Sequence, residues 1–273
     1  MDRDFVEREY TNRALVPEHP QFFERWERDS AYVRSTLPGR LDLAYGPDAR
    51  HRLDVFPAQA SRGTVVFFHG GYWRSLDKDM FSWLAAPFVA AGIGVVLPRY
   101  RLVPSVSIEH VAEDALAAVN WVFANGSALG LALDRVVLSG WSAGAHLAAS
   151  VFAAPRERLA FDPARIAGGV AMSGVFEFEP LRHYSFNTEF KLDPAAVARL
   201  DLARKRRSIA APLVVAAGAG ESSEFQRQSR VLAEAWHPQA RPLMLLPGVH
   251  HFAIVDAFAE RGQPLHQATV SLF

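Results

Sequence analysis

The hydrophobic pattern along the chain changes near residue 64. Between residues 20 and 37 apolar side chains are scattered among charges, as on a surface helix, and residues 41–46 and 51–57 roughly alternate between apolar and polar positions. This alternation is typical of antiparallel strands with one exposed face. Continuous apolar runs follow, and they predict strands covered on both faces: 64–70, 94–98, 135–140, 168–174, 212–218 and 241–248.

Helical stretches separate most of these runs, and we predict helices over 77–91, 107–124, 142–153, 224–236 and 252–260. This alternation indicates an α/β fold, with a mainly parallel central sheet of about eight strands and helices on both faces. The 273 residues fit one domain spanning 1–273. Residues of about 175–208 are irregular and rich in aromatic side chains. We interpret them as a small lid insertion over the carboxyl ends of the strands.

Composition excludes several classes of protein. Lys plus Arg and Asp plus Glu both number 29, and this balance argues against a general nucleic-acid binder. The chain contains no Cys, so it has neither a thiolate nucleophile nor a Cys-ligated metal. No apolar run is long enough to span a bilayer, and the charged N-terminus does not resemble a secretion signal. We therefore expect a cytoplasmic protein without a membrane partner.

The segment "VVLSGWSAGAHLAAS" (136–150) joins a predicted strand to a predicted helix through Gly-x-Ser-x-Gly. At such a junction a tight turn exposes the serine hydroxyl, and Gly140 and Gly144 leave room for the neighbouring backbone. Ser142 is then a nucleophile. The alternative is that Ser142 only caps the helix.

A nucleophilic serine needs a base and a carboxylate that orients the base. In folds that carry this turn the acid follows a strand after the serine, and the histidine follows the last strand. Glu221 and Glu224 occupy the first place, and His250 and His251 occupy the second. We prefer Glu221, because Glu224 falls in the first turn of a helix, and we prefer His251, because Phe252 can anchor the helix that follows.

Negative charge that develops on a carbonyl oxygen needs N–H donors, and one donor is commonly worth about 3 kcal/mol. The amide of Ala143, directly after the serine, is one candidate. The turn at His69-Gly70-Gly71-Tyr72-Trp73 follows an early strand and offers the amides of Gly71 and Tyr72. With all three parts in order, the sequence predicts a serine hydrolase. We expect no metal, because the two adjacent histidines cannot easily both face one ion. We also expect no organic cofactor.

These segments together resemble the kynurenine formamidase (arylformamidase) branch of the α/β-hydrolase fold, a neighbour of the hormone-sensitive-lipase-like esterases. The segments that carry the resemblance are "HGGYW" (69–73), "GWSAGAHLA" (140–148), "GESSEFQRQS" (220–229) and "GVHHF" (248–252). The stretches "EYTNRALVPEHP" (9–20) and "FEPLRHYSFN" (178–187) are similar in kind. The chain departs from the family at Glu221, where the family commonly has Asp, and at His250, where it more often has an acidic residue.

The resemblance implies hydrolysis of an N-formyl arylamine, for instance N-formylkynurenine in tryptophan degradation, through a Ser142–His251–Glu221 triad. An aromatic leaving group would need a broad slot, and several aromatic side chains and one histidine could line it: Tyr72, Trp73, Phe178, His183, Tyr184 and Phe186. Two alternatives stay open: a carboxylesterase for small acyl esters, and a protein of this fold that binds a ligand without turnover. We expect a small-molecule substrate and leave open a homodimer.

Overall fold

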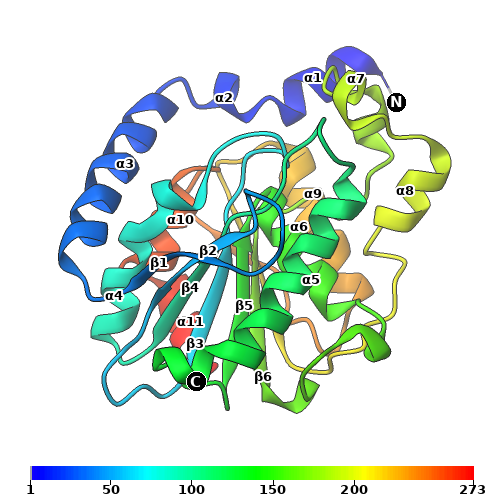
Figure 1. The fold of residues 1–273 in the computed structure, drawn as a ribbon. Coiled ribbons are helices and arrows are strands. Elements are labelled where there is room, and N and C mark those ends of the chain that lie inside the picture. Colours follow the sequence, from blue (N-terminus) through cyan, green and yellow to red (C-terminus); the bar gives the residue numbers. More distant parts are fainter. Residues whose placement is uncertain (1) are drawn as a thin grey trace.

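The computed structural model describes residues 2–273. Eight strands form one sheet in the order β1-β2-β4-β3-β5-β6-β7-β8. The pairs β1–β2 and β2–β4 are antiparallel and the other five pairs are parallel, so the predicted mainly parallel sheet is confirmed (Figure 1). The strands are β1 (Arg40–Ala44), β2 (Arg52–Phe56), β3 (Thr64–Phe68), β4 (Gly94–Pro98), β5 (Val136–Trp141), β6 (Ile166–Met172), β7 (Leu213–Gly218) and β8 (Met244–Leu246).

Helices cover both faces of the sheet, as the alternating pattern predicts. Successive side chains of a strand point to opposite faces, and β3 shows this clearly. Val66 and Phe68 pack with residues of α5, α6 and α9, whereas Val65 and Phe67 pack with residues of α3, α4 and α10. The helices are α1 (Arg3–Tyr10), α2 (Asn12–Leu15), α3 (His19–Thr36), α4 (Ala85–Ala90), α5 (Ile108–Asn125), α6 (Ala143–Phe152), α7 (Asn187–Phe190), α8 (Pro194–Leu200), α9 (Ser223–Ala235), α10 (Ala253–Ala259) and α11 (Pro264–Val270).

The segment predicted as one helix over 77–91 consists of two shorter elements. A 3-10 helix spans Lys78–Leu84, and α4 follows it directly. Pro87 has no N–H group to donate to the carbonyl of Trp83 four residues earlier, so regular α-helical bonding cannot run through this point. The final predicted strand, 241–248, is likewise shortened to the three residues of β8.

The first two helices and the connection at α8 lie well outside the sheet. We call Arg3–Val16, which includes α1 and α2, the N-terminal arm. It crosses the top of the molecule in Figure 1, and α1 packs against α9 and the 3-10 turn Pro180–His183. Two hydrogen bonds hold the second half of α1 in place. The amide of Ser185 donates to Glu7 Oε1 (2.6 Å), and the hydroxyl of Ser222 donates to the Glu9 carbonyl (2.7 Å).

Candidate functional site

Ser142 occupies a strained turn between β5 and α6. Its backbone lies at φ 56° and ψ −119°, which a residue with a side chain adopts only under constraint. Its amide donates to the Met172 carbonyl on the neighbouring strand (2.8 Å). Ser142 stands at the N-cap position of α6, yet among the described residues its hydroxyl makes no capping hydrogen bond. The geometry thus gives no support to a role limited to helix capping.

The two glycines that flank Ser142 leave space that backbone occupies. A Cβ on Gly144 would lie 1.9 Å from the Phe68 carbonyl oxygen, and one on Gly140 would lie 2.1 Å from the Gly144 carbonyl oxygen. Real Cβ atoms do not approach so closely. The absence of a side chain on Gly144 lets the start of α6 meet the end of β3, and its absence on Gly140 lets the end of β5 lie against α6. These contacts hold the serine turn against the sheet.

Glu221 and His251 meet in the structure. The Nδ1–H of His251 donates to Glu221 Oε2 (2.8 Å), and both residues are buried. The other carboxylate oxygen of Glu221 accepts from the Ser173 hydroxyl and from the Gly218 amide, each at 2.6 Å. The hydrogen bond from His251 leaves Nε2 as the ring atom free to exchange a proton.

Two contacts restrain His251, one at its backbone and one at its imidazole ring. The indole N–H of Trp141, the residue before Ser142, donates to the His251 carbonyl (2.7 Å). The ring of Phe225 packs against the imidazole with centroids 4.6 Å apart. This packing limits the imidazole to a narrow range of positions.

Glu224 and His250 have other partners. Glu224 accepts from the hydroxyl of Tyr10 (2.8 Å) and pairs with Arg227 (2.7 Å), so its carboxylate joins α9 to the N-terminal arm. His250 Nδ1 accepts from the amides of Phe252 and Ala253 (3.2 Å each), which open α10. Of the two alternatives in each pair, the structure therefore brings together Glu221 and His251.

The backbone of the turn after β3 adopts φ angles that favour glycine. Gly71, Tyr72 and Trp73 all have positive φ (111°, 52° and 56°). A Cβ on Gly71 would lie 2.2 Å from the Ser75 carbonyl oxygen. The Tyr72 hydroxyl donates to the carbonyl of Tyr10 in the N-terminal arm. The oxyanion role of the Gly71, Tyr72 and Ala143 amides stays a prediction.

His69 supports this turn from within the core. Its ring stacks on Tyr100 with centroids 4.3 Å apart, and its Nδ1–H donates to the Gly70 carbonyl (2.7 Å). Burial lowers the pKa of His69 to about 4. The imidazole is neutral near pH 7, which suits a structural role as a hydrogen-bond donor to the turn.

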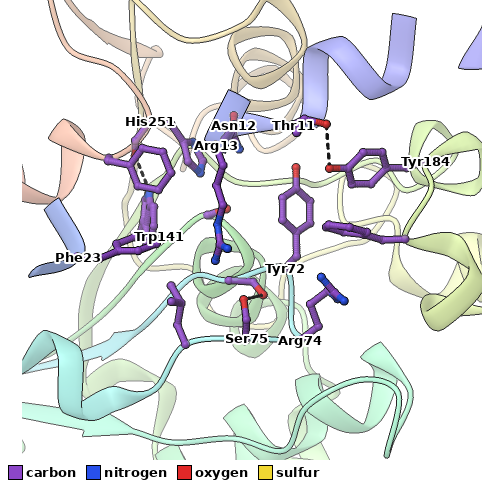
Figure 2. Close-up of a pocket in the computed structure, with 15 residues that line it drawn as sticks. Thr11, Asn12, Arg13, Phe23, Tyr72, Arg74, Ser75, Trp141, Tyr184 and His251 are labelled. Atoms are coloured by element: carbon purple, nitrogen blue, oxygen red, sulfur yellow. Dashed lines mark hydrogen bonds between the residues drawn. The ribbon is translucent and has the colours of Figure 1, made fainter. Parts of the chain in front are cut away.

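Ser142 and His251 line one cavity of about 140 Å³. Tyr72, Tyr184 and Phe186 also line it, whereas Trp73 and Phe178 are fully buried behind its wall and pack against each other. Residues far apart in the sequence share this lining (Figure 2): Thr11, Asn12, Arg13, Phe23, Gly71, Tyr72, Arg74, Ser75, Leu76, Trp141, Ser142, Tyr184, Phe186, His251 and Phe252.

The N-terminal contribution to the cavity was not predicted from the residues themselves. Thr11, Asn12 and Arg13 belong to the arm, and Phe23 belongs to α3. Asn12 is buried, and its side-chain nitrogen has no hydrogen-bond partner among residues 2–273. The signal available in the sequence was the family resemblance of "EYTNRALVPEHP", which contains the three arm residues.

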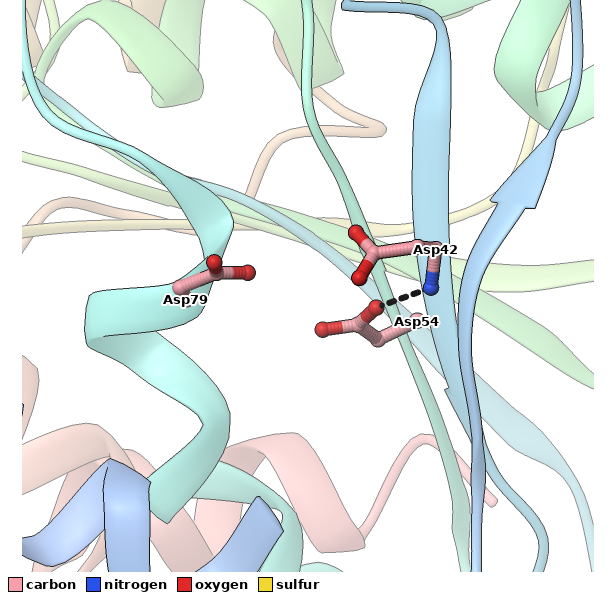
Figure 3. Close-up of side chains that lie close together, drawn as sticks. All are labelled: Asp42, Asp54 and Asp79. Atoms are coloured by element: carbon pink, nitrogen blue, oxygen red, sulfur yellow. Dashed lines mark hydrogen bonds between the residues drawn. The ribbon is translucent and has the colours of Figure 1, made fainter.

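Three carboxylates outside the cavity lie close enough together to suggest a cation site. Asp42, Asp54 and Asp79 offer oxygens within 4.8 Å of one another (Figure 3). The ammonium group of Lys78 lies 2.8, 2.8 and 2.6 Å from these three residues in turn, and Arg34 pairs with Asp54 as well. Burial acts to lower the pKa of Lys78, but the carboxylates of Asp54, Asp42 and Asp79 together outweigh it and the pKa is raised. The Lys78 side chain thus supplies the cation that these carboxylates require.

Among residues 2–273, no helix has the length and apolar character needed to cross a membrane.

Comparison with known proteins gives this site a family context. Residues 65–226 match the model of a family described as having the alpha/beta hydrolase fold. Kynurenine formamidase of Danio rerio is 28% identical over 84% of this chain and 80% of its own length. Kynurenine formamidase of Salmo salar is 26% identical over 100% of this chain and 95% of its own length. The resemblance to kynurenine formamidases is confirmed.

A solved structure extends the comparison over nearly the whole fold. A protein from Silicibacter sp. TM1040, named provisionally as a thioesterase, superposes with a TM-score of 0.87 at 30% identity. The match covers 97% of this chain and 98% of that one. The family match, the relatives and the sheet agree, and the chain belongs to the alpha/beta hydrolase family.

Proposed function

We propose that the protein is a serine hydrolase of the arylformamidase type, with Ser142, His251 and Glu221 as its catalytic residues. The observation that carries the proposal is the buried Glu221–His251 hydrogen bond (2.8 Å), whose histidine lines the same cavity as Ser142. The strained Ser142 backbone and the similarity to kynurenine formamidases support it.

The roles follow from the hydrogen bond between His251 Nδ1 and Glu221, which leaves Nε2 for proton transfer. His251 Nε2 takes the proton of Ser142 as the serine oxygen attacks the formamide carbonyl, and Glu221 stabilises the resulting imidazolium. Amides of Gly71, Tyr72 and Ala143 donate to the oxyanion. His251 then returns the proton to the departing arylamine and a formyl-serine ester remains. Water, activated by the same histidine, attacks that ester, releases formate and restores the serine.

The test compares kcat/KM for N-formylkynurenine and for p-nitrophenyl acetate. The proposal expects turnover of the formamide, and kcat should fall at least about 10⁴-fold in Ser142→Ala. Ser150→Ala is the matched control. Ser150 lies in α6, its hydroxyl donates to the His146 carbonyl, and it does not line the cavity. Undetectable deformylation beside rapid ester hydrolysis would exclude the formamidase.

A second candidate is a hydrolase for small acyl esters or thioesters. The observation that favours it is the 30% identical relative named as a thioesterase, which matches over nearly all of the chain. The same machinery would serve, with an alcohol or thiol as the leaving group. A protein that binds without turnover is tested by a fluorophosphonate: stoichiometric labelling that is lost in Ser142→Ala excludes this third reading.

A further inference from the structure

The cavity beside Ser142 contains cationic side chains and no carboxylate among its lining residues. Its two arginines are Arg13, from the N-terminal arm, and Arg74, from the segment after β3. Most of the remaining wall is aromatic, aliphatic or hydroxyl-bearing. A concave site with an apolar wall and a few charged groups selects a ligand by the charges that it leaves uncompensated.

The charge of Arg74 is compensated within the protein. Its guanidinium binds both carboxylate oxygens of Glu189 (2.5 and 2.9 Å) in the fork geometry that arginine prefers. It also lies over the ring of Phe186, 4.2 Å from the centroid. Arg74 therefore acts as a connection between the turn after β3 and α7, and its donors are already engaged.

The charge of Arg13 is not compensated in this way. Within residues 2–273 its guanidinium forms no ion pair and no side-chain hydrogen bond. It lies over the ring of Phe23, 5.4 Å from the centroid. Figure 2 shows the side chain directed into the cavity, in this view between Trp141 and Tyr72. Arg13 is an exposed residue, so its guanidinium donors face water and are free to bind a ligand that enters the cavity.

The backbone that carries Arg13 is held in place on both sides. The Tyr72 hydroxyl donates to the carbonyl of Tyr10, and the Thr11 hydroxyl lies 3.2 Å from that of Tyr184. On the other side of Arg13, Val16 is buried among core residues and the ring of His19 stacks on Phe252 with centroids 5.6 Å apart. A charged group on an anchored segment is placed in advance, so less ordering is needed when a ligand binds.

We propose that Arg13 is a specificity-determining residue that binds a carboxylate on the leaving group of the substrate. The inference rests on the proposed formamidase function, because a formyl group carries only hydrogen on its carbonyl carbon. Any group that the protein can recognise must then lie on the amine side. A planar guanidinium with free donors fits a carboxylate with two parallel hydrogen bonds.

The experiment uses substrates that differ in one charge: N-formylkynurenine and its carboxamide. Wild-type protein should prefer the acid. Arg13→Gln should lower kcat/KM for the acid about 10- to 100-fold, mainly through KM, as expected for loss of a charge-assisted contact. It should change kcat/KM for the carboxamide less than about twofold. Arg13→Lys, which keeps the charge but not the fork, should fall between wild type and Arg13→Gln.

Arg8→Gln is the matched control, because Arg8 lies on the same arm, pairs with Glu9 and does not line the cavity. It should leave both substrates unchanged. An equal loss for acid and carboxamide in Arg13→Gln indicates a merely structural role and overturns the inference. Equal kcat/KM values of wild type for the two substrates overturn it as well, while the formamidase itself stands.

A binding measurement separates the two proposals. Isothermal titration calorimetry on wild type and Arg13→Gln measures the affinities for anthranilate and for anthranilamide without any turnover. If neither formamide is hydrolysed, the proposed function fails and binding alone decides the anion site. Tighter binding of anthranilate that is lost in Arg13→Gln supports the site, and equal affinities overturn it.

Discussion

The two carboxylate oxygens of Glu221 have different partners, and only one of them faces the proposed catalytic histidine. Oε1 accepts from the Ser173 hydroxyl and the Gly218 amide, and Oε2 faces the Nδ1–H of His251. Three donors converge on the carboxylate, so its orientation is fixed. The methylene group that distinguishes Glu from Asp is accommodated because the first oxygen is anchored to the end of β7.

Replacing Glu221 by Gln tests this division. The Gln amide nitrogen would face either the Nδ1–H of His251 or the donors of Ser173 and Gly218. In the first case the histidine loses its acceptor, and in the second the side chain loses the contacts that orient it toward the histidine. We expect kcat for the preferred substrate to fall about 10²- to 10⁴-fold. Steady-state kinetics measure the fall, and circular dichroism checks that the variant is folded.

Glu224→Gln is the comparison, since Glu224 contacts Tyr10 and Arg227 and not His251. It should keep kcat within about threefold and lower the midpoint of thermal unfolding by a few degrees, because buried Glu224 loses its charge and with it the ion pair to half-buried Arg227. A large fall in kcat for Glu224→Gln together with a small one for Glu221→Gln would show that the acid is assigned to the wrong residue.

At the scale of elements, the N-terminal arm is a wall of the cavity that is attached through side chains. The Tyr10 hydroxyl donates to Glu224 Oε2 (2.8 Å) and accepts from the amide of Gln228 (2.9 Å). Tyr10 is fully buried. One hydroxyl therefore joins α1 to α9, and the residues that follow it place Thr11, Asn12 and Arg13 at the cavity.

Tyr10→Phe removes that hydroxyl, so the Glu224 carboxylate and the Gln228 amide each lose one of their hydrogen bonds. We expect a loss of about 1–3 kcal/mol in the free energy of unfolding. KM should rise because the arm is held less firmly, while kcat changes little. Urea unfolding and limited proteolysis within the first 20 residues measure both effects. Tyr32→Phe, at a largely exposed position, should alter neither, and unchanged proteolysis in Tyr10→Phe would contradict the role given to the arm.

The elements of the core could be predicted because their apolar runs are continuous. The predicted strand 94–98 matches β4, and the predicted helix 107–124 differs from α5 by one residue at each end. The arm could not be predicted in this way, since α1 is highly charged and buries only Val6 and Tyr10. Its position depends on side-chain contacts with residues about 60 to 215 positions away, which no local pattern contains.

The residues of the candidate site also differ in how far a local pattern predicts them. The order of Ser142, Glu221 and His251 along the chain follows from the fold, so each place could be read from the ends of predicted strands. The choice of Glu221 over Glu224 depended on where a helix begins, and α9 does begin at Ser223. The place of Arg13 in the cavity depends on tertiary contacts alone, and it emerged only with the structure.

For the whole molecule, two buried histidines couple stability to pH. Burial lowers the pKa of His69 to about 4 and that of His146 to about 3. His146 lies in α6 and packs against Trp73 and Phe178. In the unfolded chain both groups titrate near pH 6.5. Below that pH the unfolded chain binds protons that the folded protein excludes, so stability is full above pH 6.5 and falls as the pH decreases.

Each histidine contributes about 1.4 kcal/mol of lost stability per pH unit between about pH 6 and pH 4. Urea unfolding of wild type at pH 7.5, 6.0, 5.5 and 5.0 should show the combined loss of about 2.7 kcal/mol per unit below pH 6. His146→Gln removes one titrating group, so its slope should be smaller by about half of that value whatever its absolute stability. Identical slopes for the two proteins would show that His146 is not buried in its neutral form.

The attachment of the N-terminal arm also sets an order of assembly. Tyr10 is synthesised well before its partner Glu224, which lies 214 positions later in the chain. The arm therefore has no docking surface until α9 has been made, and contacts of such long sequence separation form late because loop closure must come first. The cavity wall that carries Arg13 is in this sense synthesised before the elements that hold it and is among the last parts to be put in place.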